Sequence, residues 1–400
     1  MPQDISSTSL HDTPPSSRRK TLAAASLAHG VHDGLTDVIY VLLPLWQVAF
    51  GLSYAQVGLL RGAYAGMMAG FQLLASKGAR RWGREALLIR GTTLAGLAYL
   101  MAAQASDLNL LLIALMFAGL GASTQHPLAS ALVADAYEGS GKVKQALAQY
   151  NFAGDIGKAL IPGLVGLVLV YVSWQTNATA LGLLGLGAAA ALWWLLRQAP
   201  LAGRSTRKAI AQDRVGSRSG LAALIATGTL DSGVRMGFLT FLPFLLQSKG
   251  ATTAQIGLAL TLLFIGGAFG KLFCGYLGAR LGPVRTVICT ELLTAGLILV
   301  ALLLPYLPLM LVMPLIGVAL NGTSSVLTGL VPDFAGSEQR ERVFACFYTG
   351  TVGGGALAPV LIGAISDHTG VEHGLMALAG MLLLTLPLCL VVHTGLPHRQ

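Results

Sequence analysis

Long apolar runs separated by short polar segments dominate the chain. Twelve of these runs have about 20 residues or more, the length at which an α-helix crosses the hydrocarbon core of a bilayer. The pattern therefore predicts an all-α membrane protein with twelve transmembrane helices. The predicted spans are residues 22–48, 55–76, 87–105, 109–134, 147–172, 177–197, 220–246, 254–276, 286–304, 308–331, 343–365 and 374–393.

Composition strengthens this prediction. Of the 400 residues, 54% are hydrophobic and 11% are charged, so the chain cannot cover a soluble surface with polar groups. This excludes an ordinary cytosolic enzyme, a disordered scaffold and a secreted disulfide module. The fifty glycines suit closely packed membrane helices. The four cysteines lack metal-site spacing and are interpreted as small apolar residues: Cys274, Cys289, Cys346 and Cys389.

The formal net charge of +9 is explained by topology, with no need for a nucleic-acid partner. Twenty of the 26 Lys and Arg residues lie in segments on one side of the predicted spans, and only Lys249 lies in a loop on the other side. Cytoplasmic loops carry the excess of basic residues. We therefore expect a multi-pass protein of the bacterial inner membrane with both termini in the cytoplasm and an uncleaved first span.

The two halves of the chain resemble each other. Residues 43–58 match residues 242–257 at an offset of 199, and Asp33 falls on Asp231 at an offset of 198. Two repeated six-helix halves are a transporter architecture with the substrate site at the repeat interface. The predicted organisation is an N-terminal tail (1–21), a first half (22–197), a basic cytoplasmic linker (198–219), a second half (220–393) and a C-terminal tail (394–400).

Two loops carry a family resemblance. Residues 78–84 and 275–285 resemble the loop motif of the major facilitator superfamily, although both lack its usual Asp. Within the superfamily, residues 26–29 with Asp33, residues 119–127, and residues 147–149 followed by glycines and a proline resemble the fosmidomycin-resistance type. The chain departs from that type at Asp155, where Asn is usual, and span 4 carries His126 where many drug–proton antiporters have Arg.

The resemblance implies the major facilitator fold and secondary active transport by alternating access. It also implies proton-driven efflux of small polar or anionic compounds, fosmidomycin-like drugs included, by a monomer without a cofactor. Two alternatives remain open: a symporter or uniporter for a small metabolite, and a receptor or scaffold that no longer transports. The chain contains no nucleotide-binding loop and no enzyme motif, so ATP is not the expected driver and no enzyme activity is expected.

Ionisable residues inside the spans are the best site candidates, because charge in the hydrocarbon costs at least about 2.5–3.5 kcal/mol. His29, Asp33 and Asp37 follow each other at every fourth position and share one face of span 1. Asp33 is the first candidate for a proton carrier, since its repeat mate Asp231 also lies in the first span of a half. The alternative is a fixed hydrogen bond between His29 and Asp33 that ties span 1 to span 5.

Span 5 places Asp155 and Lys158 on one face. We expect Lys158 to bind a phosphonate or carboxylate, with Asp155 as its resting counter-ion and as a second proton-carrier candidate. A purely structural pair is the alternative.

Two further pairs are expected. Arg61 of span 2 lies at a level that suits Asp37, and Arg235 follows Asp231 by four residues in span 7. The second pair either neutralises itself or opens to free Arg235 for an anionic substrate.

Gln125, His126 and Pro127 interrupt span 4, where a proline removes one backbone hydrogen bond. The interruption suits a hinge or a binding notch, with His126 as a proton carrier or as a packing residue. No second His or Cys follows His126 closely, so no metal site is expected. The further candidates for substrate binding are Arg61, Asp231, Gln125 and, in span 1, His32 and Tyr40.

Two symmetric pairs are expected at the cytoplasmic ends as latches of an inner gate. Asp135 and Asp333 end spans 4 and 10, and we expect them to pair with Arg81 and Arg280. These four residues are not expected to contact the substrate.

We also expect Glu291 to pair with Lys271, because both residues lie near the cytoplasmic helix ends. The polar outer segment 367–373 is interpreted as a hydrated loop.

Overall fold

A computed structural model describes residues 14–198, 216–334 and 340–397, and these segments contain helices and no strands. The predicted all-α fold is confirmed. Most of the predicted linker 198–219 lies outside the described residues, as do residues 1–13 and 398–400. The helices are α1 (Pro15–Asp37), α2 (Ile39–Phe50), α3 (Tyr54–Trp82), α4 (Arg84–Ala103), α5 (Leu108–Ala122), α6 (Gln125–Ala136), α7 (Val143–Val168), α8 (Trp174–Arg197), α9 (Arg218–Ser248), α10 (Thr253–Leu281), α11 (Pro283–Leu303), α12 (Tyr306–Leu330), the 3₁₀ helix η1 (Val331–Phe334), α13 (Arg340–Thr369), α14 (Val371–Leu383) and α15 (Thr385–Gly395).

Twelve helical rods follow from these elements, because three of the rods are each interrupted once. The first consists of α1 and α2, the fourth of α5 and α6, and the twelfth of α14 and α15. The fourth rod breaks at residues 123–124, just before the predicted interruption. Pro127 consequently lies in the first turn of α6, where its missing N–H costs no helical hydrogen bond.

Eight of the rods are long and apolar enough to cross a membrane. The other four are the rod of α1 and α2, and the helices α3, α7 and α9. These four contain most of the buried or half-buried ionisable residues of the predicted sites, namely Asp33, Asp37, Arg61, Asp155, Lys158, Asp231 and Arg235, whereas His126 lies in α6. The hydropathy of a span thus falls where the chain places charge inside it.

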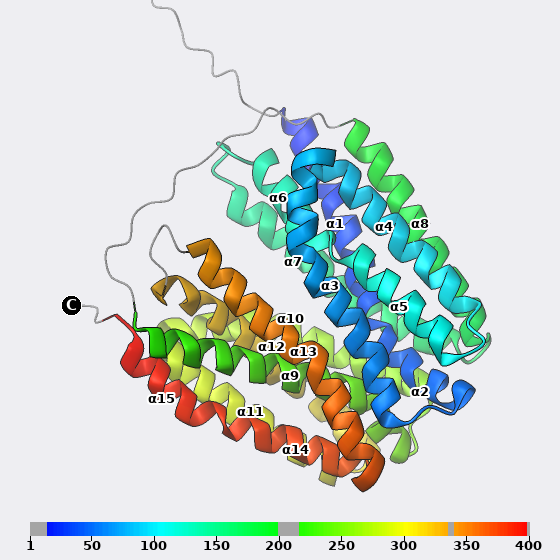
Figure 1. Cartoon of the computed structure of the whole chain (residues 1–400), viewed down its shortest axis with the longest axis vertical. Helices are drawn as coiled ribbons and strands as arrows, with labels where there is room; N and C mark the ends of the chain where they lie inside the picture. The colour runs from blue at the N-terminus through cyan, green and yellow to red at the C-terminus, as the bar shows by residue number, and fades with distance from the viewer. Residues whose placement is uncertain (1–13, 199–215, 335–339, 398–400) are drawn as a thin grey trace, which may run out of the picture.

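The helices form two groups (Figure 1). One group contains α1–α8 and the other contains α9–α15. Contacts between the groups are concentrated in two helix pairs, α3 with α13 and α7 with α10, and are supplemented by α2 with α9. α3 and α13 pack closely, and a β-carbon at Gly58 would overlap the backbone carbonyl of Pro359. The absence of a side chain at Gly58 permits this approach.

The two groups contact each other most closely at the end opposite the described chain ends. There the Asp367 carboxylate accepts hydrogen bonds from the first two backbone N–H groups of α3, at Tyr54 (2.6 Å) and Ala55 (3.0 Å). The Tyr54 ring also contacts Phe241 and Phe244 of α9. The predicted hydrated loop at Asp367 is therefore, in part, a contact between the halves.

The glycines of these helices toward the other end do not show such close approaches. Among the described residues, no atom lies within 4 Å of the position that a β-carbon would take at Gly70 of α3, Gly275 of α10 or Gly353 of α13. In Figure 1 the ends of the two groups that carry the chain termini accordingly point apart. The described part of the chain is closed at one end of the bundle and open at the end of the termini.

Candidate functional site

Small residues bring α1 and α7 together around the site. A β-carbon at Gly157 would overlap the backbone carbonyl of Gly30, and one at Gly154 would lie 2.7 Å from both Asp33 Oδ2 and His29 Nε2. Real side chains do not tolerate such distances, so glycine is required at both positions of α7. The close approach places the polar face of α1 directly against α7.

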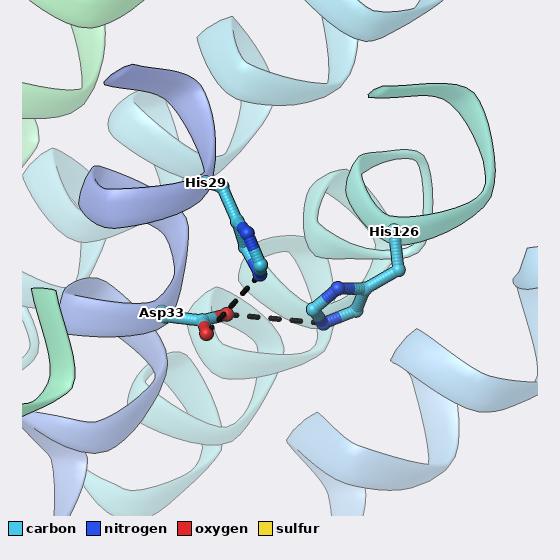
Figure 2. A group of neighbouring side chains, drawn as sticks. All are labelled: His29, Asp33 and His126. Carbon is cyan, nitrogen blue, oxygen red and sulfur yellow. Dashed lines mark ion pairs between the residues drawn. The ribbon is translucent and has the colours of Figure 1, made fainter. Parts of the chain in front are cut away.

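Asp33 is the centre of the site. Its carboxylate lies 3.3 Å from His29 Nε2, 3.3 Å from Lys158 Nζ, 3.7 Å from His32 Nε2 and 3.8 Å from His126 Nε2. Figure 2 shows His29 and His126 approaching the carboxylate from two different helices, α1 and α6. Three imidazoles and one ammonium group therefore surround a single buried acid. We name His29, His32, Asp33, His126 and Lys158 the Asp33 cluster.

The surroundings of His29 fix where its proton lies. His29 Nδ1 is 2.9 Å from the Tyr150 carbonyl oxygen, which can only accept a hydrogen bond. Nδ1 therefore carries a hydrogen, and Nε2, which faces Asp33, has a free lone pair unless it is protonated as well. A lone pair and a carboxylate repel each other at 3.3 Å. The geometry of His29 and Asp33 is thus satisfied when one additional proton lies on one of the two side chains.

Exposure differs across the cluster. The side chain of Asp33 is 6% exposed, whereas those of Lys158 and His126 are 31% and 43% exposed. The acid thus lies deep between the helices, and the two exposed groups connect it to the accessible space. This arrangement can pass a proton inward and can present a cation to an anion.

The predicted pair of Asp155 and Lys158 is wrong. Lys158 pairs with Asp33 of α1, and Asp155 accepts a hydrogen bond of 2.5 Å from Lys271 of α10. Both residues share a face of α7, but neighbouring helices on its two sides supply closer partners than the helix itself. Lys271 consequently joins the two halves, and the expected pair between Lys271 and Glu291 does not form. Glu291 is buried, and its Oε1 atom has no hydrogen-bond partner in the described segments.

The predicted pair of Arg61 and Asp37 is also wrong, since no ion pair within 4 Å joins them in the described part of the chain. The Arg61 guanidinium is fully buried between the Tyr40 and Tyr64 rings, 4.9 and 5.4 Å from their centroids. Its Nη2 atom is 3.5 Å from Met236 Sδ of α9, and its Nε and Nη1 atoms have no hydrogen-bond partner among the described residues. Aromatic faces, which attract cations, take the place of a carboxylate.

The second half does not reproduce the cluster. Asp231 is buried like its repeat mate Asp33, but among the described residues no ion pair within 4 Å joins it to Arg235. The expected intrahelical pair is therefore absent, because the spacing of four residues permits the contact without requiring it. Gln125 is buried beside the cluster, and within the described ranges its Nε2 atom has no hydrogen-bond partner.

The sequence of the chain matches a known protein family. The model of the Major Facilitator Superfamily matches residues 25–228 and 221–400, which together cover most of the chain. The chain belongs to the major facilitator superfamily. The predicted fold of two six-helix halves is thereby confirmed, and the chain is a multi-pass membrane protein and a secondary transporter.

Relatives of this superfamily member agree with the assignment. The chain is 25% identical to the fosmidomycin resistance protein of Escherichia coli (strain K12), over 96% of this chain and 97% of that protein. It shares its fold with a bacterial homolog of the human lysosomal transporter Spinster in the inward-facing and occupied conformation, with a TM-score of 0.82, 17% identity and coverage of 96% and 98%. A point mutant of the nucleoside transporter NupG matches with a TM-score of 0.76, 13% identity and coverage of 94% and 99%.

The predicted inner-gate pairs need correction in this superfamily member. Asp135 pairs with Arg84, the first residue of α4, and not with Arg81 three residues earlier. The Arg81 guanidinium lies 5.8 Å from the centroid of the Trp82 ring. The loop between α3 and α4 turns at Gly83, so it carries Arg84 to the end of α6 and leaves Arg81 one helix turn away.

The second gate pair is not present either. The Arg280 guanidinium lies 4.6 Å from the centroid of the Tyr276 ring on its own helix. Among the described residues no ion pair within 4 Å joins Arg280 to Asp333, which lies in η1. The two halves therefore differ at their inner ends, although both keep a basic loop in the same place.

Three residues of the site were not predicted from the sequence. The carbonyl of Tyr150 orients His29, the Tyr64 hydroxyl is 2.7 Å from Thr36 Oγ1, and Asp367 links the halves. Backbone carbonyls leave no signal in a sequence, and tyrosines are common in membrane helices. Asp367 could have been recognised as a carboxylate near a helix start only after its partner helix α3 was known.

Proposed function

We propose that this chain is a proton-coupled transporter that exports small polar or anionic compounds by alternating access. The Asp33 cluster is the observation that carries the proposal. It combines a buried acid, a proton that the geometry of His29 and Asp33 calls for, and two partly exposed cationic or protonatable groups. A carrier without a nucleotide-binding loop needs a coupling ion to move a compound against its gradient, and this cluster can supply one.

Anion recognition is assigned to Lys158 and His126. Both lie within 4 Å of Asp33 and are partly exposed, so a phosphonate or carboxylate can reach them without entering the apolar core. Arg61 and Gln125 carry side-chain donors that have no hydrogen-bond partner among the described residues, and we include both in the proposed site. We include Asp37, His32, Tyr40, Asp231 and Arg235 in the proposed polar surroundings of the substrate.

The state described here fits the proposed cycle. If the basic loops lie in the cytoplasm, the open end of the bundle faces the cytoplasm and the end closed by Asp367 faces outward. The compound would then enter from the cytoplasm, and transport requires that the outer contacts break while the inner ends approach. Of the gate candidates, Asp135 is held by Arg84, and we propose that the basic loops carrying Arg81 and Arg280 approach each other in the outward-open state.

Antiport requires that the proton and the compound bind alternately, because coupling arises only from a difference in affinity between states. A polar compound that donates a hydrogen bond to the Asp33 carboxylate excludes a proton from the same oxygen. A proton arriving from the outer side would then release the compound. The name of the relative, a fosmidomycin resistance protein, supports export as the direction and fosmidomycin-like compounds as the class.

Symport is the second candidate, and the contact between Lys158 and Asp33 favours it. An anion that binds Lys158 withdraws the cation from Asp33, and a buried carboxylate without its cation favours the protonated form. The anion and the proton would then bind together and move in the same direction. The two mechanisms use the same residues and differ in the sign of the coupling.

The test uses inside-out membrane vesicles with an acidic lumen, reported by a pH-sensitive dye. Fosmidomycin, other phosphonates and simple carboxylates are added outside, one at a time. We expect one compound to dissipate the gradient, and we expect Lys158→Gln to remove this response. Lys144→Gln is the matched control, because Lys144 lies on the same helix but is exposed at its end.

The outcomes separate the candidates. Dissipation by an externally added compound supports antiport, whereas dissipation only when the compound is preloaded in the lumen supports symport. A response that Lys158→Gln leaves intact would refute the assignment of Lys158. A folded protein that responds to no compound from either side would contradict proton coupling.

A further inference from the structure

Three imidazoles and a carboxylate converge at the Asp33 cluster, and this donor set suits more than a proton. One ligand atom from each of His29, Asp33 and His126 can be chosen so that all three lie within 4.8 Å of one another. Figure 2 shows that the side chains of these residues point toward a common centre. His32 adds a fourth nitrogen, 3.7 Å from Asp33 Oδ1.

The distances are close to those of a tetrahedral metal site. Metal–ligand distances of about 2.0–2.1 Å place neighbouring ligand atoms about 3.3 Å apart. His29 Nε2 has this separation from Asp33 Oδ2, at 3.3 Å, whereas His32 Nε2 and His126 Nε2 lie 3.7 and 3.8 Å from the other carboxylate oxygen, Oδ1. Formation of the site therefore requires the Asp33 carboxylate to turn one oxygen toward the ion and His32 and His126 to move closer to it.

The surroundings of two histidines match those of metal ligands. His29 donates its Nδ1 hydrogen to the Tyr150 carbonyl, which directs the Nε2 lone pair toward the centre, as outer hydrogen-bond partners do in metal sites. His32 is 8% exposed, and its Nε2 atom has no hydrogen-bond partner in the part of the chain that the structure describes. A buried nitrogen without a partner is costly, and a bound cation would satisfy it.

The ligand types select the metal. Three imidazole nitrogens with one carboxylate oxygen suit Zn²⁺ and similar transition-metal ions, whereas Ca²⁺ and Mg²⁺ require mostly oxygen ligands. Lys158 opposes a metal, since its ammonium group lies 3.3 Å from Asp33 Oδ2. Its side chain is 31% exposed, so it can withdraw toward the accessible space when an ion enters.

We propose that His29, His32, Asp33 and His126 form a binding site for a divalent transition-metal ion of the Zn²⁺ type. The ion takes the place of the proton between His29 and Asp33 and joins α1 to α6 across the break in the fourth rod. Bound metal would therefore block the proposed proton movement, but binding itself does not depend on the proposed transport function.

The test measures binding directly in purified protein in detergent. Co²⁺ is titrated as a spectroscopic substitute, because four-coordinate Co²⁺ absorbs in the visible range, and Zn²⁺ is then used to displace it. We expect one ion per chain, and we expect His126→Gln to weaken binding roughly tenfold or more. His373→Gln, which removes an exposed histidine on α14, is expected to leave binding unchanged.

A third variant keeps the test informative if a substitution disturbs folding. Lys158→Gln removes the competing cation and should strengthen metal binding, a gain that misfolding cannot produce. Absence of the Co²⁺ absorption in the folded protein would overturn the proposal. Equal affinity in the His126→Gln variant, or weaker binding in the Lys158→Gln variant, would overturn it as well. Because no transport is measured, failure here leaves the vesicle experiment unaffected.

Discussion

The contact made by Asp367 predicts how firmly the transporter is closed at the end opposite the chain termini, which is the outer end in the proposed orientation. The carboxylate accepts two backbone hydrogen bonds, of 2.6 and 3.0 Å, from the start of α3 in the other half. A carboxylate that caps a helix in this way typically contributes about 0.5–2 kcal/mol. The contact can exist only while the halves are closed at this end, so its removal lowers the stability of that state alone. Asp367→Ala should therefore shift the equilibrium toward the outward-open state by about 2- to 30-fold.

Asp107 offers a matched control. It caps α5 within a single half, accepting from the backbone N–H groups of Asn109 (2.8 Å) and Leu110 (3.0 Å). Asp107→Ala should lower the thermal stability by a similar amount, but it should not change the balance of states, because both states contain this cap.

Spin labels at the outer ends of the two halves measure the shift. Tyr171 and Leu307 are 87% and 74% exposed, and only the two exposed cysteines, Cys289 and Cys346, need to be replaced before labelling. Distance distributions from pulsed electron paramagnetic resonance should show a larger long-distance population in the Asp367→Ala variant. An unchanged distribution, or an equal shift in the Asp107→Ala variant, would refute the reasoning.

Two further predictions concern packing and the contact between the halves. Gly154→Ala places a methyl group 2.7 Å from Asp33 Oδ2, so it should lower the free energy of unfolding by about 1–3 kcal/mol and remove most of the transport. Gly187→Ala, whose methyl group meets no described neighbour within 4 Å, should keep both the stability and the transport. Thermal unfolding and the vesicle assay measure the two effects. Lys271→Gln should change the ratio of the two conformational populations, measured by the spin-label distances, less than about fivefold, because partly exposed ion pairs contribute about 0.2–1 kcal/mol. A double variant that exchanges Lys271 and Asp155 for each other should restore the original distance distribution. A swapped pair that behaves like the single variant would count against a direct role of this contact.

Helix positions could be predicted from the sequence because they depend on the length and spacing of apolar runs. The twelve rods, the two halves and the polar stripe of His29, Asp33 and Asp37 all follow from local pattern, from the repeat or from family resemblance. The break in the fourth rod was also predicted near His126, since proline disfavours a continuous helix.

Partner choice could not be predicted in the same way. Spacing along one helix suggested Asp155 for Lys158, but each of these residues pairs with a different neighbouring helix. The choice depends on how far α7 approaches α1, and Gly154 sets that distance. A shift of one helix turn likewise exchanged Arg81 for Arg84 as the partner of Asp135.

The repeat predicted equivalent roles for Asp33 and Asp231, and the structure separates them. Asp33 has three imidazoles and Lys158 within 4 Å, whereas no comparable ion pair is found for Asp231 among the described residues. The first half therefore concentrates the titratable chemistry. The second half supplies groups that reach across the interface, such as Lys271 and Asp367. If the Asp33 cluster binds the ligands as proposed, the contacts of Lys271 and Asp367 between the halves would couple that binding to the change of state.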